Sequence, residues 1–577
     1  MRLSFGLEIP VPDIEPVQPT SARHVLNSES VSLWSKAPRL DLGTMGCILG
    51  PLFRREPSSP RVAELSRDDV DDILRSRGAA LLAKFWGGYV ALLASSDGTI
   101  SILRDPSGMM PCYFRRMASR LAIASDMGTL VKPGQTKVDF DSLARMFAGV
   151  DMIGRRTGIS GVEELLPGEM LIISPDGGIR IEPAWSPWEH VDPQDLMDID
   201  ATAHTLRETL WNCIGAWSTC FDNILVGVSG GLDSSIIAAA LGSCASNVRL
   251  LTMVEPGTDG DERRYARALA ELLGRRLDEV SYDLGATDVC KAVLPHLPLP
   301  VAAHYFQAIA AEHGRISADW PVGAYFSGNG GDNVLCAMRS AAPLADRFLT
   351  TPVSPGLFST ARDLADLTGA GLPKVIHQGI SRVRRRHEGH RVVCNFTGLG
   401  SAGCAAALAG SDRHPWLSMP AGSLPGKCAH VAMLARAGRS IELYPRETDP
   451  PQISPFLSQP VVELCLSIPT WYWVHAGRDR AMARQAFKDV LPALIVERRT
   501  KGGPTGFIQR IFAAQRQEAI LMLEHGKLVE TGLLDREWLR NLSQHSWRDD
   551  GRDLRLLSFA AAEAWVRWWE DASDTCR

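Results

Sequence analysis

Long apolar runs are absent from this sequence of 577 residues. No stretch approaches the roughly 20 consecutive apolar residues of a membrane-spanning helix. The opening residues, MRLSFGLEIPVPDIEP, carry acids and prolines where a secretory signal has an apolar segment. The sequence therefore predicts a cytoplasmic protein that neither enters a membrane nor is exported.

An excess of basic residues is also absent, since 61 Lys and Arg stand against 66 Asp and Glu, for a net charge of -5. Nucleic-acid binding draws on many Lys and Arg side chains that neutralise phosphates, so we expect no nucleic acid as the main ligand. The 12 cysteines are scattered, and the close pair Cys213 and Cys220 has neither zinc-ligand nor redox spacing. The sequence predicts reduced thiols in the cytoplasm.

The composition is that of an ordinary globular protein, with 45% hydrophobic and 22% charged residues. The chain is longer than one core can fill, and its pattern changes near residue 190, so we predict two domains, 1–190 and 191–577. In the first domain, short apolar segments within 89–124 are separated by turns at Asp97-Gly98 and at PSGMM. This spacing is typical of an antiparallel sheet.

The second domain alternates strand and helix patterns. Predicted strands cover 224–228, 248–254, 276–283 and 322–328, and predicted helices cover 203–217, 233–242 and 261–274. Strands separated by helices form a doubly wound parallel sheet, and ligands of such sheets bind outside the carboxyl ends of the strands. We therefore expect the functional site of the second domain at that edge.

The sequence VSGGLDSS (228–235) stands where the first of these strands turns into a helix. Its two glycines let the backbone approach an anion, and Ser229, Ser234 and Ser235 offer hydroxyl groups. The start of the helix presents free N–H groups to a phosphate. It is not a Walker sequence, because the terminal Gly-Lys-Ser/Thr is missing. A plain tight turn needs neither three hydroxyls nor an acid, so we predict a phosphate-binding loop.

These residues resemble the pyrophosphate loop of the ATP-pyrophosphatase superfamily. A second glycine-rich sequence, SGNGGDN (327–333), is similar to a signature of its asparagine synthetase branch, and segments 453–469 and 477–487 also resemble that branch. The resemblance implies a C-terminal doubly wound ATP-pyrophosphatase (PP-loop) synthetase domain that uses ATP and Mg²⁺. Asp233 and Asp332, on separate loops, are the carboxylates expected to hold the metal ion.

The resemblance also implies the remaining site residues. Lys501, in VERRTKGG (496–503), is the expected stabiliser of the charge that develops at the carboxyl under attack. The alternative interpretation of this segment is a basic loop exposed to solvent. Adenine is expected at the backbones of Val228 and Met253, although an ordinary buried strand residue is an equal alternative for Met253. The nucleotide site as a whole comprises Val228, Ser229, Gly230, Gly231, Asp233, Ser234, Ser235, Met253, Gly328 and Gly330.

The N-terminal part carries a second resemblance. FWGGYVALL (85–93), RDPSGMMPCYF (104–114) and GISGVEELLPGEML (158–171) look like the Ntn-hydrolase-like glutaminase domain of class II amidotransferases, an antiparallel β sandwich with helices. That domain uses an amino-terminal cysteine whose thiol is the nucleophile and whose own α-amine is the base. The first cysteine here is Cys47, so we expect a domain without glutaminase activity. The amine then comes from the substrate or from free ammonia.

Within the asparagine synthetase-like group, the form GNGGDN and the segment 453–469 look most like the cyclases that close the macrolactam of lasso peptides. This resemblance implies a precursor peptide as substrate and a leader-processing protease as partner. Asparagine synthetases typically carry Glu where this chain has Asn329, which counts against asparagine synthesis. An asparagine synthetase, a β-lactam synthetase-type ligase and an inactive scaffold protein remain the alternatives.

Overall fold

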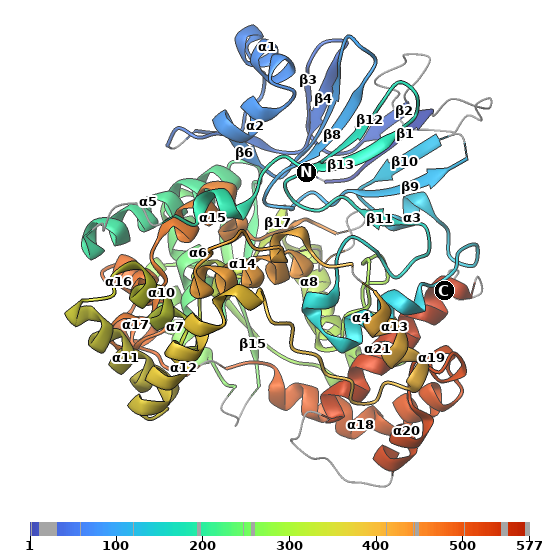
Figure 1. The fold of residues 1–577 in the computed structure, drawn as a ribbon. Helices are drawn as coiled ribbons and strands as arrows, with labels where there is room; N and C mark the ends of the chain where they lie inside the picture. Colours follow the sequence, from blue (N-terminus) through green and yellow to red (C-terminus); the bar gives the residue numbers. More distant parts are fainter. Residues whose placement is uncertain are drawn as a thin grey trace.

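The computed structural model shows two antiparallel sheets stacked on an α/β part (Figure 1). The predicted fold class, an N-terminal antiparallel sheet domain followed by a C-terminal parallel α/β domain, is confirmed. The structure describes residues 1, 3–10, 32–57, 59–118, 120–192, 198–245, 247–255, 260–410, 412–441, 444, 449–500, 502–543 and 552–571.

The N-terminal part is built from a five-stranded sheet in the order β11-β9-β10-β1-β2 and a six-stranded sheet in the order β13-β12-β8-β7-β4-β3. All the paired strands within these two sheets run antiparallel. Strands β7, β8 and β10 are buried along most of their length, which agrees with the short apolar segments bounded by turns within 89–124. The strands are β1 (Phe5–Pro10), β2 (Ser32–Ser35), β3 (Arg39–Asp41), β4 (Gly46–Leu49), β7 (Val90–Ala94), β8 (Ile100–Arg104), β9 (Tyr113–Met117), β10 (Arg120–Ala124), β11 (Glu163–Glu164), β12 (Glu169–Ile173) and β13 (Ile179–Pro183).

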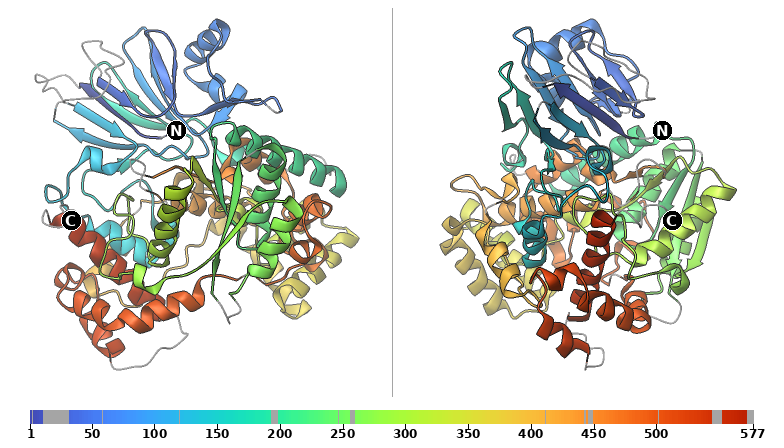
Figure 2. Two further views of the ribbon diagram at one scale, coloured as in Figure 1. Left: turned by 180° about the vertical axis from the view of Figure 1, so that it is seen from behind. Right: turned by 90° about the vertical axis from the view of Figure 1, so that its right-hand side faces the viewer.

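The second part contains a parallel sheet in the order β16-β15-β14-β17-β18, which crosses the interior in Figure 2. Its strands are β14 (Ile224–Gly227), β15 (Val248–Val254), β16 (Leu277–Ser281), β17 (Ala324–Phe326) and β18 (Gln452–Ile453). The four predicted strands and their parallel arrangement are confirmed. Helices α5 (Ile199–Ser218), α6 (Leu232–Cys244) and α7 (Arg263–Leu273) confirm the predicted helices, and α8 (Tyr305–Asp319) leads back to β17.

The C-terminal helices return to the N-terminal part. The core of α18 (Thr505–Glu524) and α21 (Arg552–Glu570) is continuous with that of α4 (Phe140–Ala148). The rings of Phe147 on α4 and Phe559 on α21 lie 4.3 Å apart. Figure 1 shows α4 beside α21, with α13 (Ser401–Ala409) against both. The N-terminal part and the C-terminal helices therefore share a core.

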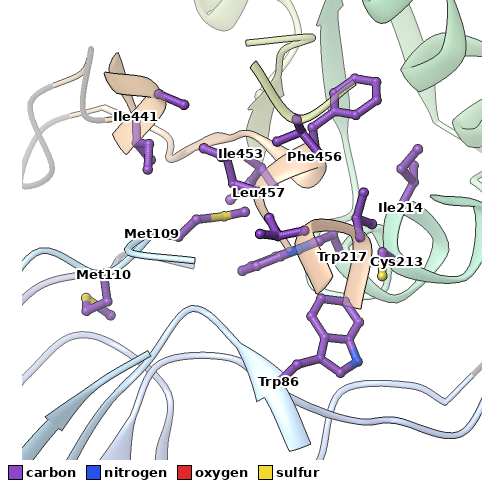
Figure 3. Packing of buried hydrophobic residues seen from close by; sticks show 14 of the residues in the cluster. Trp86, Met109, Met110, Cys213, Ile214, Trp217, Ile441, Ile453, Phe456 and Leu457 are labelled. Carbon is purple, nitrogen blue, oxygen red and sulfur yellow. The ribbon is translucent and has the colours of Figure 1, made fainter. Parts of the chain in front are cut away.

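A second shared core lies under the sheets. Met109 and Trp86 from the N-terminal part pack toward Leu457 and Trp217 from the second part (Figure 3). The indole N–H of Trp217 also donates to the Ser458 hydroxyl at 3.1 Å. The predicted boundary near residue 190 falls between a short 3₁₀ turn (Pro187–His190) and α5, and it stays a prediction.

Membrane segments were not expected. Among the described residues, each helix is too short or too polar to cross a bilayer.

Candidate functional site

The predicted phosphate loop connects β14 to α6 at the carboxyl edge of the sheet. Val228 ends the strand pairing, with its N–H donating to the Leu251 carbonyl at 2.8 Å. Gly230 has a φ of 62°, and a Cβ there would lie 2.3 Å from the Cβ of Tyr265 on α7. Only glycine fits both the left-handed backbone and the close approach of α7. Helix α6 then begins after Gly231 with no side-chain cap, so its first N–H groups remain for a ligand.

The serines of this loop hold the loop itself. The Ser234 hydroxyl accepts from the Ser229 N–H at 3.2 Å and lies 3.3 Å from the Gly231 carbonyl, to which it donates. The Ser235 hydroxyl donates to the same carbonyl at 2.8 Å. These bonds fix the turn that exposes the amides of the α6 N-terminus. The hydroxyls of Ser234 and Ser235 thus support the loop in this structure.

The second glycine-rich loop runs from β17 into the short helix α9 (Gly331–Val334) and packs directly on the first loop. A Cβ on Gly328 would lie 2.6 Å from the Ser234 backbone nitrogen, and one on Gly331 would lie 2.7 Å from the Asp233 Cβ. Gly330 has a φ of 81°. The glycines at 328 and 331 are therefore explained by contact between the two loops, and the glycine at 330 by its backbone conformation.

Helix α14 (Pro425–Ala437) holds the second loop from behind. The Asn333 side-chain amide donates to the Met433 carbonyl at 2.7 Å. His430 Nε2 lies 2.9 Å from the Val334 carbonyl, to which it donates. Burial lowers the pKa of His430 to about 3, so this imidazole is neutral and acts as a hydrogen-bond donor. The position of Asp332, one residue before Asn333, is therefore set by α14.

The two predicted metal-binding carboxylates, Asp233 and Asp332, both contact one arginine, Arg480. Arg480 Nη1 lies 2.7 Å and 3.0 Å from the two carboxylate oxygens of Asp233, and 2.6 Å from Asp332. The Arg480 side chain is 8% exposed, and its backbone has a φ of 50°, which is unusual for a residue with a Cβ. Burial opposes the charge on Arg480, but Asp233, Asp332 and Asp479 raise its pKa above the usual value. This arginine was not predicted.

The donor chemistry fits a magnesium ion. Carboxylate oxygens are the ligands that Mg²⁺ prefers, and the oxygens of Asp233 and Asp332 already converge on one cationic atom. The Asp332 side chain is 41% exposed and faces the pocket described next. Among the described residues there is no group of three or more His, Cys, Asp or Glu that would form a complete protein cage for a metal. An ion here would complete its shell with phosphate or water oxygens.

A pocket of about 280 Å³ opens in front of these residues. Gly231 and Leu232, at the α6 N-terminus, form one wall together with Asp332. Asp479 also lines the pocket and forms ion pairs with Arg480 and Arg484. Burial opposes the charge on Asp479, but these two arginines outweigh burial and hold its pKa below the usual value. Five arginines line the pocket, namely Arg339, Arg480, Arg484, Arg498 and Arg499. Three of them are paired with acids, but the lining still holds more arginines than acids, which suits an anionic ligand.

Arg498 joins the phosphate loop to the segment that contains Lys501. Its Nη1 donates to the Gly230 carbonyl at 3.0 Å, its Nη2 pairs with Glu262 at 2.7 Å, and its guanidinium lies 4.0 Å from the ring centre of Tyr265. The Gly502 N–H donates to the same Glu262 at 3.1 Å. Lys501 itself lies outside the described residues, but its neighbours flank the phosphate loop.

Met253 lies in β15, the strand next to β14. Its side chain is partly buried against Leu251, Ile316 and Tyr325. The expected contact of its backbone and of the Val228 backbone with adenine stays a prediction.

Cys47 is a core residue of β4. It is fully buried, and burial raises the pKa of its thiol to about 11. A protonated thiol inside a sheet is not a nucleophile. The N-terminal domain thus has no glutaminase nucleophile at this position.

Comparisons with known proteins identify both parts of the chain. The family described as Asparagine synthase matches residues 206–389 and 453–567, which together are more than half of the chain. The family described as Glutamine amidotransferase domain matches residues 68–185. A search of curated proteins gives no match.

Solved structures with similar segments were also found. Glutamine phosphoribosylpyrophosphate amidotransferase from B. subtilis, complexed with ADP and GMP, is 13% identical over 50% of this chain and 77% of its own, with a TM-score of 0.18. The U34-tRNA thiolase NcsA from Methanococcus maripaludis, with its [4Fe-4S] cluster, is 14% identical over 45% of this chain and 86% of its own, with a TM-score of 0.20.

The family assignment rests on the two family matches and agrees with the sheets and loops described above. Members of the asparagine synthase family use ATP. The chain belongs to the asparagine synthase family and is an ATP-dependent, asparagine synthetase-like ligase that forms amide bonds.

Proposed function

We propose that this ligase closes a macrolactam in a precursor peptide. It adenylates an Asp or Glu side-chain carboxylate of the peptide, and the peptide's N-terminal amine then displaces AMP. The observation that carries the proposal is the arginine-lined pocket in which Asp233 and Asp332, from separate loops, converge beside the α6 N-terminus. The reaction takes place in the cytoplasm, where ATP is available.

The pocket provides three means of binding a triphosphate. The start of α6, which no side chain caps, borders it, the helix dipole favours negative charge there, and the arginines offset that charge. Asp233 and Asp332 would hold Mg²⁺, which neutralises phosphate charge when bound. Arg480 keeps these two carboxylates together and lies within the same pocket.

In the first step a carboxylate oxygen of the peptide attacks the α-phosphorus of ATP. A new P–O bond forms, the bond to the β-phosphate oxygen breaks, and pyrophosphate leaves as a tetraanion. Arg498 fixes the phosphate loop from behind through the Gly230 carbonyl, so that its amides stay aimed at the pocket. We assign to Lys501 the stabilisation of charge at the carboxyl group under attack.

In the second step the neutral α-amine attacks the acyl carbon, AMP leaves with the bonding electron pair, and the nitrogen loses one proton to the solvent. An α-amine has an ordinary pKa of about 7.7 to 8.0, so a useful neutral fraction exists at cell pH without a strong base. Asn329 does not act as a base, because a carboxamide is not basic. Its side-chain oxygen accepts from the Gly330 N–H at 3.0 Å and supports the loop. The chief contribution of the protein is then to hold the two ends of the peptide together.

A peptide that supplies both reacting groups agrees with the N-terminal domain. Cys47 is buried and protonated, so it does not release ammonia from glutamine. The amine is then best supplied by the substrate. The precursor peptide and a leader-processing protease, which exposes the N-terminal amine, are the proposed partners.

Mass spectrometry tests this proposal. The purified chain is incubated with ATP, Mg²⁺, the protease and the precursor peptide encoded beside it, and AMP and the mass of the core peptide are measured. We expect AMP and a core that has lost one water, both absent with Asp332→Asn and both present with Asp141→Asn, an exposed residue of α4. Asparagine formed from aspartate and ammonia, or no AMP with any substrate, would overturn the proposal.

A further inference from the structure

A second cavity, of about 240 Å³, lies between the two parts of the chain. The N-terminal sheets contribute Tyr113 and Leu166 to its wall, and the synthetase part contributes Leu434, Leu457 and Val462. We call it the interdomain cavity. No step of the reaction described above uses it.

The interdomain cavity lies directly behind the nucleotide site. Leu457 lines it, and the same side chain approaches Gly330 so closely that a Cβ there would lie 3.1 Å from the Leu457 Cγ. On α14, Met433 lines the nucleotide pocket, while its neighbours Leu434 and Ala435 line the interdomain cavity. One helix and one leucine therefore separate the two spaces.

The wall of the interdomain cavity is chemically suited to an apolar group. Its charged side chains are engaged locally. Arg104 donates to the carbonyls of Gly108, Met110 and Leu165 and pairs with Glu164 at 2.6 Å. Arg439 donates to the Ile153 carbonyl at 2.8 Å, and the Ser107 hydroxyl donates to the Gly87 carbonyl. The remaining lining is mostly Leu, Val, Ile, Met and Pro.

The histidine of the wall carries no charge. His414 accepts from the Trp416 N–H through Nδ1, and burial lowers its pKa to about 3. A polar ligand would thus lose hydrogen bonds to water without gaining equal ones.

Size and access agree with a side chain as the ligand. An apolar cavity of about 150 Å³ already binds benzene, so 240 Å³ holds the largest apolar side chains of proteins. Val150, which is 42% exposed, also lines the cavity. The space therefore reaches from the protein surface to the back of the loop that carries Asp332.

We infer that the interdomain cavity is a subsite for one large apolar side chain of the peptide substrate. Anchoring that side chain behind the second loop holds the peptide while its carboxylate lies in front of it, and it selects peptides with an apolar residue near the reacting carboxylate. The inference rests on the proposed function in that the ligand belongs to a peptide.

Fluorine NMR with N-acetyl-4-fluorophenylalaninamide tests the subsite without any turnover. The wild-type chain should broaden the fluorine signal, and excess N-acetyl-serinamide should not reverse this. Val301→Trp, which fills the cavity from a partly exposed loop, should weaken binding by about tenfold or more. The matched control is Ala302→Trp, whose side chain is exposed beside it. Val150→Trp is a second variant that fills the cavity, and it stands where the lining is exposed at the surface.

Equal binding to wild type and both cavity variants, or no broadening by the wild type at millimolar ligand, would overturn the inference. ATP affinity is measured in parallel on the same samples. A wild-type chain that does not bind ATP would contradict the proposed function. The fluorine signal reports on the interdomain cavity alone.

Discussion

At the scale of single residues, Arg480 explains how two acids from distant loops can lie together. Two carboxylates at one point repel each other, and burying an uncompensated charge costs several kcal/mol. Arg480 offsets this cost through one guanidinium nitrogen that contacts both Asp233 and Asp332. The left-handed backbone at Arg480 costs about 1 kcal/mol or more, which the ion pairs must outweigh. A protein cation therefore holds the two acids together.

Replacing Arg480 should reveal the cation site. Arg480→Gln leaves buried Asp233 without its counter-charge and is expected to destabilise the fold by about 3 kcal/mol. Millimolar MgCl₂ should recover part of this loss, because a divalent cation can take the vacated place between the carboxylates. Thermal unfolding with and without MgCl₂ measures both effects.

The control is Arg499→Gln, which removes an exposed arginine of the same pocket. Its unfolding temperature should stay near that of the wild type, and MgCl₂ should shift it no more than it shifts the wild type. An Arg480→Gln variant as stable as the wild type would show that the arginine does not hold the site.

Sequence reasoning reached the two acids and missed the arginine for a physical reason. Each acid follows a glycine-rich loop at a strand end, and that local pattern predicts its function. Arg480 lies 247 residues from Asp233 and 148 from Asp332, and its neighbourhood has no glycine loop or cap that marks an active site. Its role comes only from the folded arrangement, in which an unusual backbone conformation turns it toward both acids.

At the scale of elements, the two glycine-rich loops form one interlocked unit. Gly328 lies against the backbone of Ser234, and Gly331 lies against Asp233. The strands β14 and β17 are adjacent and parallel, so their carboxyl ends deliver both loops to one place. Alternating strand and helix patterns predicted both strands and the parallel sheet, but not that these two strands are neighbours. They missed β18, because a strand of two residues is defined by its pairing with β17 and not by a local pattern.

A methyl group at Gly328 should separate the loops. The Gly328→Ala side chain would lie 2.6 Å from the Ser234 nitrogen, so the backbones must shift at a cost of about 2 kcal/mol. Because this shift moves Asp332 away from Asp233, we expect the rate of AMP formation to fall by about 30-fold. Steady-state assays of AMP release, together with the ATP-induced rise in unfolding temperature, measure the effect.

Gly314→Ala is the matched substitution, since a Cβ there meets nothing within 4 Å on the exposed side of α8. It should keep full activity and gain slightly in stability from the better helix propensity of alanine. Wild-type ATP response in Gly328→Ala would mean that the loops tolerate separation, and the interlocked arrangement would lose its support.

At the scale of the whole molecule, the N-terminal part and the synthetase part are held together by shared cores and by buried ion pairs. Asp151, in a 3₁₀ turn that follows α4, is one such link. It accepts from Arg436 Nε at 2.7 Å, at the end of α14, and from His390 Nε2 at 2.8 Å. Helix α14 also positions the second glycine-rich loop. The link therefore connects the N-terminal part to the helix behind the active site.

The Asp151 link makes a prediction about acid stability. Burial alone would raise the pKa of Asp151, but hydrogen bonds and charge from His390 and Arg436 hold it well below its usual value near 4. A depressed folded-state pKa contributes stability that is complete above the unfolded-state pKa and is lost as pH falls through the folded-state pKa. Asp151→Asn should therefore unfold about 2 kcal/mol more easily than the wild type at pH 7. That difference should shrink steadily below about pH 4.

Unfolding temperatures of both proteins between neutral pH and about pH 3 measure this difference, and other titrating groups largely cancel because both chains contain them. Asp141→Asn, an exposed acid on α4, should follow the wild-type curve throughout. A gap between Asp151→Asn and the wild type that stays constant down to about pH 3 would mean that the carboxylate charge does not carry the link. We expect the gap to shrink as the pH falls, and we expect Asp151→Asn to form AMP more slowly than the wild type at neutral pH. Together these results would show that contact between the two parts of the chain supports the geometry of the synthetase site through α14.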